Sequence, residues 1–189
     1  MTAIRQFERD LEETGADLRG HFRLTSGLHS PRFFLMARLV ERPDKLKRWA
    51  DQLAELLAPY SAGTVVGPAL GGILPAYAVA ESSHRRVLYA EKTDDGEMSL
   101  YPGALSVGER VIVVEDAVAT GSSVRKVIKA VEKQHGVVEA IASLVHRGAD
   151  VQWPVPYYSV VSLSEPVPMW PADACPLCKS GVALTYPKL

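Results

Sequence analysis

The sequence is poor in cysteine and has no long apolar run, and both absences exclude whole classes of protein. Only two of its 189 residues are cysteines, so a disulfide-rich scaffold is excluded. No stretch approaches the roughly 18 unbroken apolar residues that a membrane-spanning helix needs. The first residues lack the apolar core of a signal peptide. We therefore expect a cytoplasmic protein with no membrane partner.

An excess of charge of either sign is also missing. The 21 basic and 22 acidic residues give a net charge of -1, and no run of Lys or Arg occurs, so no nucleic-acid partner is expected. The 14 glycines and 13 prolines are too scattered for a collagen-like or low-complexity chain. With 47% hydrophobic and 23% charged residues, the chain has the composition of one compact domain.

The apolar periodicity predicts an α/β fold. Spacings of three and four residues predict helices at 4–11, 43–57, 73–81 and 123–134. Nearly continuous apolar runs predict strands at 64–67, 86–90, 111–114, 140–145 and 158–163. Because helices alternate with strands, we expect a mostly parallel central sheet flanked by helices. In the second helix we expect Asp44 to cap the N-terminus, before an apolar stripe of Leu46, Trp49, Ala50, Leu53, Leu56 and Leu57.

The beginning and end of the chain differ from this pattern. Two short strands at 22–24 and 33–36, around a polar turn at 25–30, predict a small added unit over the strand ends. We interpret residues 1–189 as a single domain. It has a small N-terminal hood (1–40), an α/β core (41–165) and a C-terminal tail (166–189) that holds both cysteines.

The most informative segment, residues 110–123, joins a buried strand to a helix. Glu115 and Asp116 follow the apolar run, and the Thr120-Gly121-Ser122-Ser123 turn opens the helix. Backbone amides at a helix N-terminus, with these hydroxyls, can bind a phosphate. The two acids suit the vicinal hydroxyls of a ribose or a divalent cation. The pattern thus favours a sugar phosphate ligand, although a plain helix cap beside two solvated acids remains the alternative.

Motifs of several other chemistries are missing. The sequence has no G-x-G-x-x-G after a strand, no G-x-x-x-x-G-K-[ST] and no G-x-S-x-G, which argues against dinucleotide, P-loop and hydrolase sites. None of the five histidines has an Asp or Ser partner at the spacing of a nucleophilic triad. Structural, hydrogen-bonded histidines are expected instead.

Residues 110–123 resemble the phosphoribosyl pyrophosphate (PRPP) motif of type I phosphoribosyltransferases. Residues 20–34 look like the base-binding element of orotate phosphoribosyltransferases, 67–73 like their pyrophosphate loop, and 145–148 like the strand end that carries an arginine. The resemblance extends over nearly the whole chain, including the Cys-Pro-Leu-Cys of the tail. It implies the type I phosphoribosyltransferase fold, and transfer of phosphoribosyl from PRPP to orotate to form orotidine 5'-monophosphate and pyrophosphate in pyrimidine biosynthesis.

The resemblance also implies roles for individual residues. Asp116, Glu115 and Lys92 would be catalytic, and orotate would be bound by Arg147, Phe33, Phe34 and Ala119. Lys92 opens a polar lid, and the family resemblance implies Mg²⁺, bound through PRPP, and a homodimer. The residues implied to bind PRPP are Leu70, Gly71, Gly72, Lys92, Glu115, Asp116, Ala117, Val118, Ala119, Thr120, Gly121, Ser122 and Ser123.

Three segments depart from the family pattern. Ala119 stands where a threonine is usual, and residues 101–104 carry no charge where related chains are rich in arginine. Asp94, Asp95 and Glu97 make the lid acidic. These departures keep two alternatives open: a phosphoribosyltransferase for another nucleobase or heterocyclic acid, and a non-catalytic nucleotide-sensing protein on the same fold.

Cys175 and Cys178 have the spacing of metal ligands. No second cysteine pair and no nearby downstream histidine accompany them, so a zinc site within one chain is incomplete in the sequence pattern. Three interpretations stay open: a zinc site with four thiolates from two subunits, an unmetallated turn, and a redox-labile pair.

Overall fold

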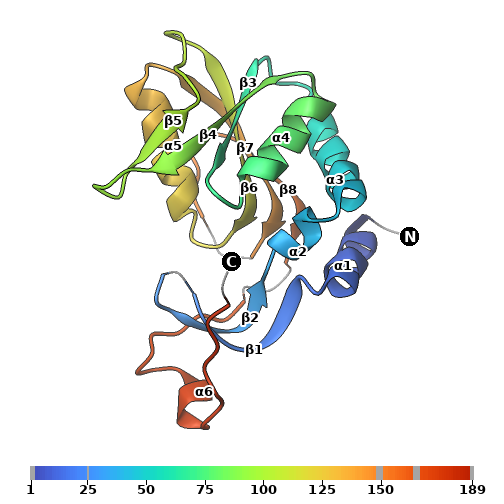
Figure 1. The fold of residues 1–189 in the computed structure, drawn as a ribbon, viewed down its shortest axis with the longest axis vertical. Coiled ribbons are helices and arrows are strands. Elements are labelled where there is room, and N and C mark those ends of the chain that lie inside the picture. Colours follow the sequence, from blue (N-terminus) through green and yellow to red (C-terminus); the bar gives the residue numbers. More distant parts are fainter. Residues whose placement is uncertain (1–2, 25, 148–150, 164–166, 188–189) are drawn as a thin grey trace.

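The computed structural model describes residues 3–24, 26–147, 151–163 and 167–187. Figure 1 shows their arrangement as an upper α/β body above a small unit that contains the C-terminal tail. The helices are α1 (Ala3–Thr14), α2 (Ala37–Val40), α3 (Pro43–Leu56), α4 (Ile73–Ser82), α5 (Ser122–Lys133) and α6 (Pro176–Lys179). The strands are β1 (Asp17–Arg23), β2 (His29–Phe34), β3 (Thr64–Pro68), β4 (Arg86–Lys92), β5 (Met98–Tyr101), β6 (Arg110–Val118), β7 (Val137–His146) and β8 (Tyr157–Ser162).

The central sheet has the strand order β5-β4-β3-β6-β7-β8. The neighbours from β4 to β8 pair in parallel, and the edge strand β5 pairs antiparallel with β4. The predicted mostly parallel sheet is confirmed. All parallel strands end at the same edge of the sheet, and ligands of open α/β sheets bind outside that edge.

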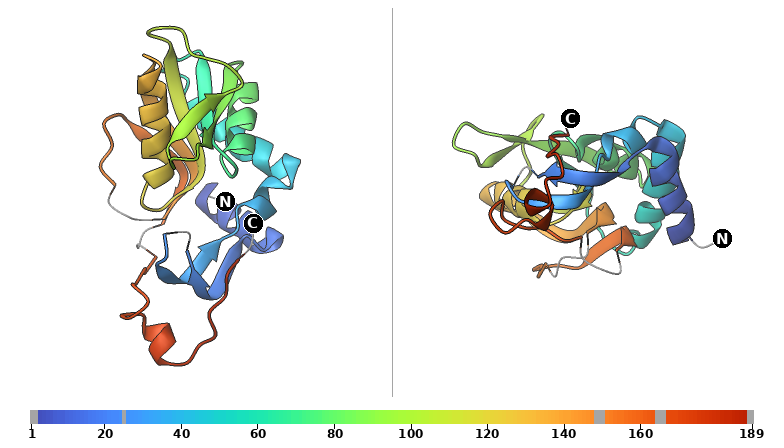
Figure 2. Two further views of the ribbon diagram at one scale, coloured as in Figure 1. Left: turned by 60° about the vertical axis from the view of Figure 1, so that its left-hand side comes forward. Right: turned by 90° about the horizontal axis from the view of Figure 1, so that it is seen from below.

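Helices cover both faces of the sheet, with α5 on one face and α3 and α4 on the other (Figure 2). Successive residues of β6 alternate between these two layers. Val111 and Val113 pack with the α5 layer, and Ile112 and Val114 pack with the α3 and α4 layer. This alternation explains the unbroken apolar run of the central strand, because both of its faces are buried.

The small unit consists of the antiparallel pair β1–β2 and the C-terminal tail. The tail crosses both strands, because Thr185 bridges to Phe22 in β1 and Trp170 bridges to His29 in β2. Figure 1 shows the short helix α6 at the far end of this unit, away from the sheet. Helix α1, by contrast, packs against β8 and contributes Phe7 and Leu11 to the main core.

Several local predictions were wrong in detail. The polar turn expected at 25–30 ends earlier, because His29 and Ser30 already belong to β2, and Thr25 lies outside the described residues. Asp44 does not cap α3: Arg42 stands at the N-cap position without a side-chain bond, and Pro43 opens the helix. Leu56 is 40% exposed and does not continue the buried stripe.

Two further elements extend beyond the predicted pattern. The strand predicted at 111–114 continues to Val118, so Glu115 and Asp116 lie within β6. Strand β5 was not predicted, since its four residues alternate and lie at an edge. In the described part of the chain, no helix has both the length and the apolar character required to cross a bilayer.

A buried carboxylate, Asp10, joins α1 to α3. Its oxygens accept hydrogen bonds from the Lys45 ammonium at 2.6 Å and the Trp49 indole at 2.9 Å. Burial alone would raise the pKa of Asp10, but the bonds from Lys45 and Trp49 outweigh it and hold the pKa below its ordinary value. Ionised Asp10 therefore stabilises the fold at neutral pH.

We predict that Asp10→Asn lowers the free energy of unfolding by about 2 kcal/mol at pH 7, the scale of a hydrogen bond to a charged group. Because the folded pKa is depressed, this stabilisation is present above the unfolded pKa and is lost as pH falls through the folded pKa. Urea unfolding of the wild type and the variant at pH 7 and near pH 3 would measure the loss of unfolding free energy at each pH. A penalty that is equal at the two pH values would contradict this account.

The matched control is Asp51→Asn. Asp51 is a half-exposed carboxylate on α3, paired with Lys47 at 2.8 Å, and it also accepts a hydrogen bond from the Ser82 hydroxyl, which an asparagine can accept as well. An exposed pair of this kind contributes less than about 1 kcal/mol, so the control variant is expected to unfold close to the wild-type urea concentration.

Candidate active site

A cavity of about 300 Å³ opens between the carboxyl ends of the strands and the small unit. Its wall combines the β6–α5 loop, the ends of β4 and β7, and residues from β2 and the tail. The lining residues are Leu24, Ser26, Phe33, Lys92, Met98, Glu115, Ala117, Val118, Ala119, Thr120, Gly121, Ser122, Ser123, Val124, Lys126, Arg147 and Met169.

The β6–α5 loop forms one side of this cavity. Gly121 adopts a left-handed conformation with φ +75 at the N-cap of α5, and an added Cβ would lie 2.4 Å from the Trp153 ring. Only glycine fits both requirements. This turn places the first amides of α5 and the hydroxyls of Thr120, Ser122 and Ser123 at the cavity, where they can bind an anion.

Glu115 and Asp116 stand at the base of this loop. Glu115 is buried at 7% exposure, and its Oε1 accepts a hydrogen bond from the Asp116 amide at 3.0 Å. The Asp116 carboxylate lies against the β3–α4 turn, since a Cβ on Gly71 would be 2.5 Å from its Oδ2. The absence of a side chain at Gly71 thus lets the β3–α4 turn approach the acid pair closely.

The environment of the acid pair opposes two negative charges. Burial raises the pKa of Glu115 well above its ordinary value, and the neighbouring Asp116 carboxylate raises it further. Burial also raises the pKa of Asp116. Ligands that donate hydroxyl groups, or that bring a cation, would stabilise the ionised pair.

Arg147, which follows β7, also lines the cavity and provides positive charge there. The residue is only 8% exposed, and its guanidinium stacks on the Phe34 ring, 5.6 Å from the centroid. Its Nη2 donates to the Arg32 carbonyl at 3.2 Å, but its buried Nε has no hydrogen-bond partner. Burial, with nearby Arg32, lowers the pKa of Arg147, so an anionic ligand would be stabilising there.

The loop between β4 and β5, predicted to be a lid, begins and ends beside the cavity, since Lys92 and Met98 line it. Lys92 at the end of β4 lines the cavity, as does Lys126 from α5. The Lys126 ammonium donates a hydrogen bond to the Gly96 carbonyl at the tip of this loop. Within this loop Asp95 accepts from the Thr93 hydroxyl, at 2.5 Å, and from the Glu97 amide, so its carboxylate is engaged locally.

The structure brings most of the predicted site residues together. The cavity is lined by Lys92, Glu115, residues 117–123, Arg147 and Phe33, whereas Asp116 and Gly71 do not line it; the Asp116 carboxylate lies against Gly71. Phe34 is buried in the core, so its ring supports Arg147 rather than facing the cavity. Leu70 is 78% exposed and Gly72 packs on Pro68; neither lines the cavity.

Sequence reasoning missed several lining residues. Lys126 follows Ser122 by one helical turn and therefore lies on the same face of α5, a spacing that could have indicated it. Ser26 and Met169 come from the small unit and the tail, and no local pattern marks them. Their place in the wall depends on how the tail folds back.

The chain matches the phosphoribosyl transferase domain family over residues 39–177. It is 41% identical to an orotate phosphoribosyltransferase of Thermotoga maritima over 179 residues, covering 94% of each chain. It is 39% identical to that of Thermus thermophilus, covering 90% of this chain and 93% of the relative. The chain belongs to the orotate phosphoribosyltransferase family.

Solved structures agree with this assignment. The crystal structure of orotate phosphoribosyltransferase from Aeropyrum pernix superposes with a TM-score of 0.71 at 28% identity, covering 82% of this chain and 92% of that chain. The Mycobacterium tuberculosis orotate phosphoribosyltransferase, at 23% identity and a TM-score of 0.68, shares the fold. The α/β fold predicted from the sequence is thus confirmed, and the enzyme places its cavity at the expected sheet edge.

We predict that Gly71→Ala lowers kcat/KM for phosphoribosyl transfer by roughly tenfold to a hundredfold, because the methyl group displaces the Asp116 carboxylate. Steady-state kinetics with varied PRPP would measure this loss. Gly63→Ala is the matched control, since an added Cβ there meets nothing within 4 Å. Unchanged kinetics of Gly71→Ala, or an equal loss in Gly63→Ala, would contradict the proposed contact.

Proposed function

We propose that this enzyme transfers the 5-phosphoribosyl group from PRPP to orotate, forming orotidine 5'-monophosphate and pyrophosphate. The observation that carries this proposal is the pairing of two sites in one cavity. The helix N-terminus of α5, which can bind an anion, and Glu115 line the same cavity as the buried cation of Arg147. The named relatives, at about 40% identity over nearly the whole chain, act on orotate.

The sugar phosphate would occupy the β6–α5 side. The α5 N-terminal amides and the hydroxyls of residues 120–123 would hold the 5-phosphate. Glu115 and Asp116 would accept hydrogen bonds from the ribose hydroxyls, which offsets the burial of these carboxylates. Lys92 and Lys126 would contact the pyrophosphate as it leaves and would close the lid over it.

Orotate would occupy the Arg147 side. The buried Nε of Arg147 has no hydrogen-bond acceptor. A carboxylate is the acceptor that a guanidinium binds best. Phe33 would cover the pyrimidine ring, and Phe34 would keep the guanidinium in place. Displacement at the sugar C1 by the ring nitrogen then needs positioning and exclusion of water.

Mg²⁺ fits the chemistry of this site. Two adjacent buried acids, each with a raised pKa, are ligands or hydrogen-bond acceptors for a group that brings positive charge. Mg²⁺ would be held chiefly by the PRPP oxygens near Glu115 and Asp116, and it would neutralise charge on the leaving pyrophosphate. We further propose a cytoplasmic homodimer, as the family resemblance implies.

The departures at Ala119 and in the lid bear on the choice of base. Ala119 is half-buried in the cavity wall, where it supplies no hydroxyl. Ser26, Ser122 and Ser123 line the same cavity and supply hydroxyls nearby. The polar wall is therefore not lost, and orotate remains the base that Arg147 favours over a neutral nucleobase.

The proposal is tested by following the loss of orotate absorbance with purified enzyme, PRPP and Mg²⁺. We expect turnover that requires all three components. Asp116→Asn should lower kcat/KM by about 10- to 100-fold, as expected when a charge-assisted hydrogen bond is lost. Arg147→Gln should lower it by about 100-fold with orotate and should reduce the preference for orotate over uracil, which lacks the carboxylate.

Arg19→Gln is the matched control, because Arg19 is an exposed arginine in β1 outside the cavity. Its kinetics should equal those of the wild type. If the enzyme transfers phosphoribosyl to another base in preference to orotate, the proposal that orotate is the substrate is wrong. PRPP binding without turnover on any base would support a nucleotide-sensing protein instead.

A further inference from the structure

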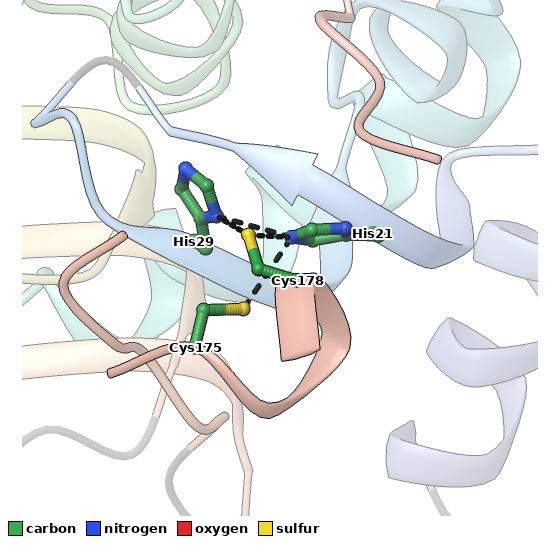
Figure 3. Close-up of side chains that lie close together, drawn as sticks. All are labelled: His21, His29, Cys175 and Cys178. Carbon is green, nitrogen blue, oxygen red and sulfur yellow. Dashed lines mark hydrogen bonds between the residues drawn. The ribbon is translucent and has the colours of Figure 1, made fainter. Parts of the chain in front are cut away.

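Four side chains that the active site does not use meet in the small unit. Figure 3 shows His21 of β1 and His29 of β2 facing Cys175 and Cys178 of the tail. Their ligand atoms all lie within 4.8 Å of one another. His21, His29 and Cys175 are buried, and Cys178 is exposed. Both thiols are free.

Four of the six separations between these atoms are close to the edges of a metal tetrahedron, and the other two, from Cys175 to His29 and to Cys178, lie within 4.8 Å. His21 Nε2 lies 3.1 Å from His29 Nδ1 and 3.4 Å from Cys175 Sγ. Cys178 Sγ lies 3.7 Å from His21 Nε2 and 3.3 Å from His29 Nδ1. Zinc bonds of about 2.0 Å to nitrogen and 2.3 Å to sulfur give tetrahedral edges of about 3.3 to 3.8 Å.

Hydrogen bonding alone does not satisfy this cluster. His21 Nδ1 lies 2.8 Å from the Val182 carbonyl, and as donor to that oxygen it leaves Nε2 with one lone pair. His29 Nδ1 and both thiols lie within hydrogen-bond distance of that nitrogen, which can accept from only one of them, and Cys178 Sγ also lies 3.3 Å from His29 Nδ1. A cation bound by all four ligand atoms would satisfy every one of them.

The surroundings supply the support that a metal site needs. The bond from His21 to Val182 fixes the ring orientation and the tautomer, as outer contacts of zinc-binding histidines do. Backbone bonds fix the segments themselves: the His29 amide donates to Trp170, and the Thr185 amide donates to His21. The tail is thus anchored to β1 and β2 on both sides of the cysteines.

We propose that His21, His29, Cys175 and Cys178 form a structural zinc site with one ion per chain. A tetrahedral set of two thiolates and two imidazoles selects Zn²⁺ over harder cations. All four ligands come from the same chain. The sequence pattern did not indicate the two histidine ligands, because they precede the cysteines and lie far from them in the sequence.

The zinc ion has a specific effect on the active site. It fastens the tail to β2, and the same tail carries Met169 into the cavity wall, next to Trp170 and its bridge to His29. Phe33 of β2 also lines the cavity. Loss of zinc therefore loosens the orotate side of the cavity, whereas the β6–α5 side keeps its support from the sheet.

The experiment begins with the metal content of the full chain expressed in zinc-supplemented medium. We expect one zinc per chain by elemental analysis, and about none in a Cys175→Ser/Cys178→Ser variant. Cobalt added to the metal-free protein should give thiolate charge-transfer bands and the intense visible bands of a tetrahedral site. Removal of zinc should lower the melting temperature by about 5 °C or more and raise KM for orotate more than KM for PRPP.

His84→Asn is the matched control, since His84 is exposed and outside the cluster. It should keep one zinc per chain, while His21→Asn should lose zinc or hold it without the tetrahedral cobalt spectrum. Wild-type protein that takes up neither zinc nor cobalt when fully reduced would contradict the proposal. So would one zinc per two chains, or zinc retained in the double cysteine variant.

Discussion

The burial of β6 on both faces is the constraint on which the rest of the site depends. The strand from Val111 to Val114 sends its side chains into two separate apolar layers, so it cannot rotate or slip without exposing one of them. Glu115 and Asp116 are therefore held at a fixed position along β6 relative to the neighbouring strands. The turn at Gly121 follows directly and starts α5 against the same sheet.

The two halves of the cavity are built in different ways. The side where we propose that the phosphate binds is local in sequence, since Glu115 and residues 117–123 line it with an acid, hydroxyls and a helix N-terminus. The side where we propose that orotate binds is assembled from β2, the end of β7 and the tail. Arg147 depends on this assembly, because its guanidinium is stacked on Phe34 and bonded to the Arg32 carbonyl.

This difference explains what the sequence could predict. Residues 110–123 were interpretable because their apolar run, acids and small-residue turn are contiguous and follow the period of a buried strand. The sequence could not show which of Phe33 and Phe34 faces the cavity. Adjacent residues of a strand point to opposite faces, and the pairing of β1 with β2, which decides between the faces, was not fixed by the sequence. Strand β5 is too short for its alternation to stand out.

The longest-range feature was the least predictable. His21 and Cys175 are 154 residues apart, and only the return of the tail across β1 and β2 brings them together. The spacing of the two cysteines indicated half of a metal site, but no motif in the sequence links the cysteines to the two histidines. The same return places Met169 in the cavity wall, so the fold of the tail determines features of both sites.

The most direct test of the central claim is a crystal structure of the enzyme with orotidine 5'-monophosphate. The account predicts the phosphate at the N-terminus of α5, on the amides and hydroxyls of residues 120–123, and the base carboxylate on the Arg147 guanidinium. A phosphate bound away from the β6–α5 loop, or a carboxylate that does not contact Arg147, would contradict it.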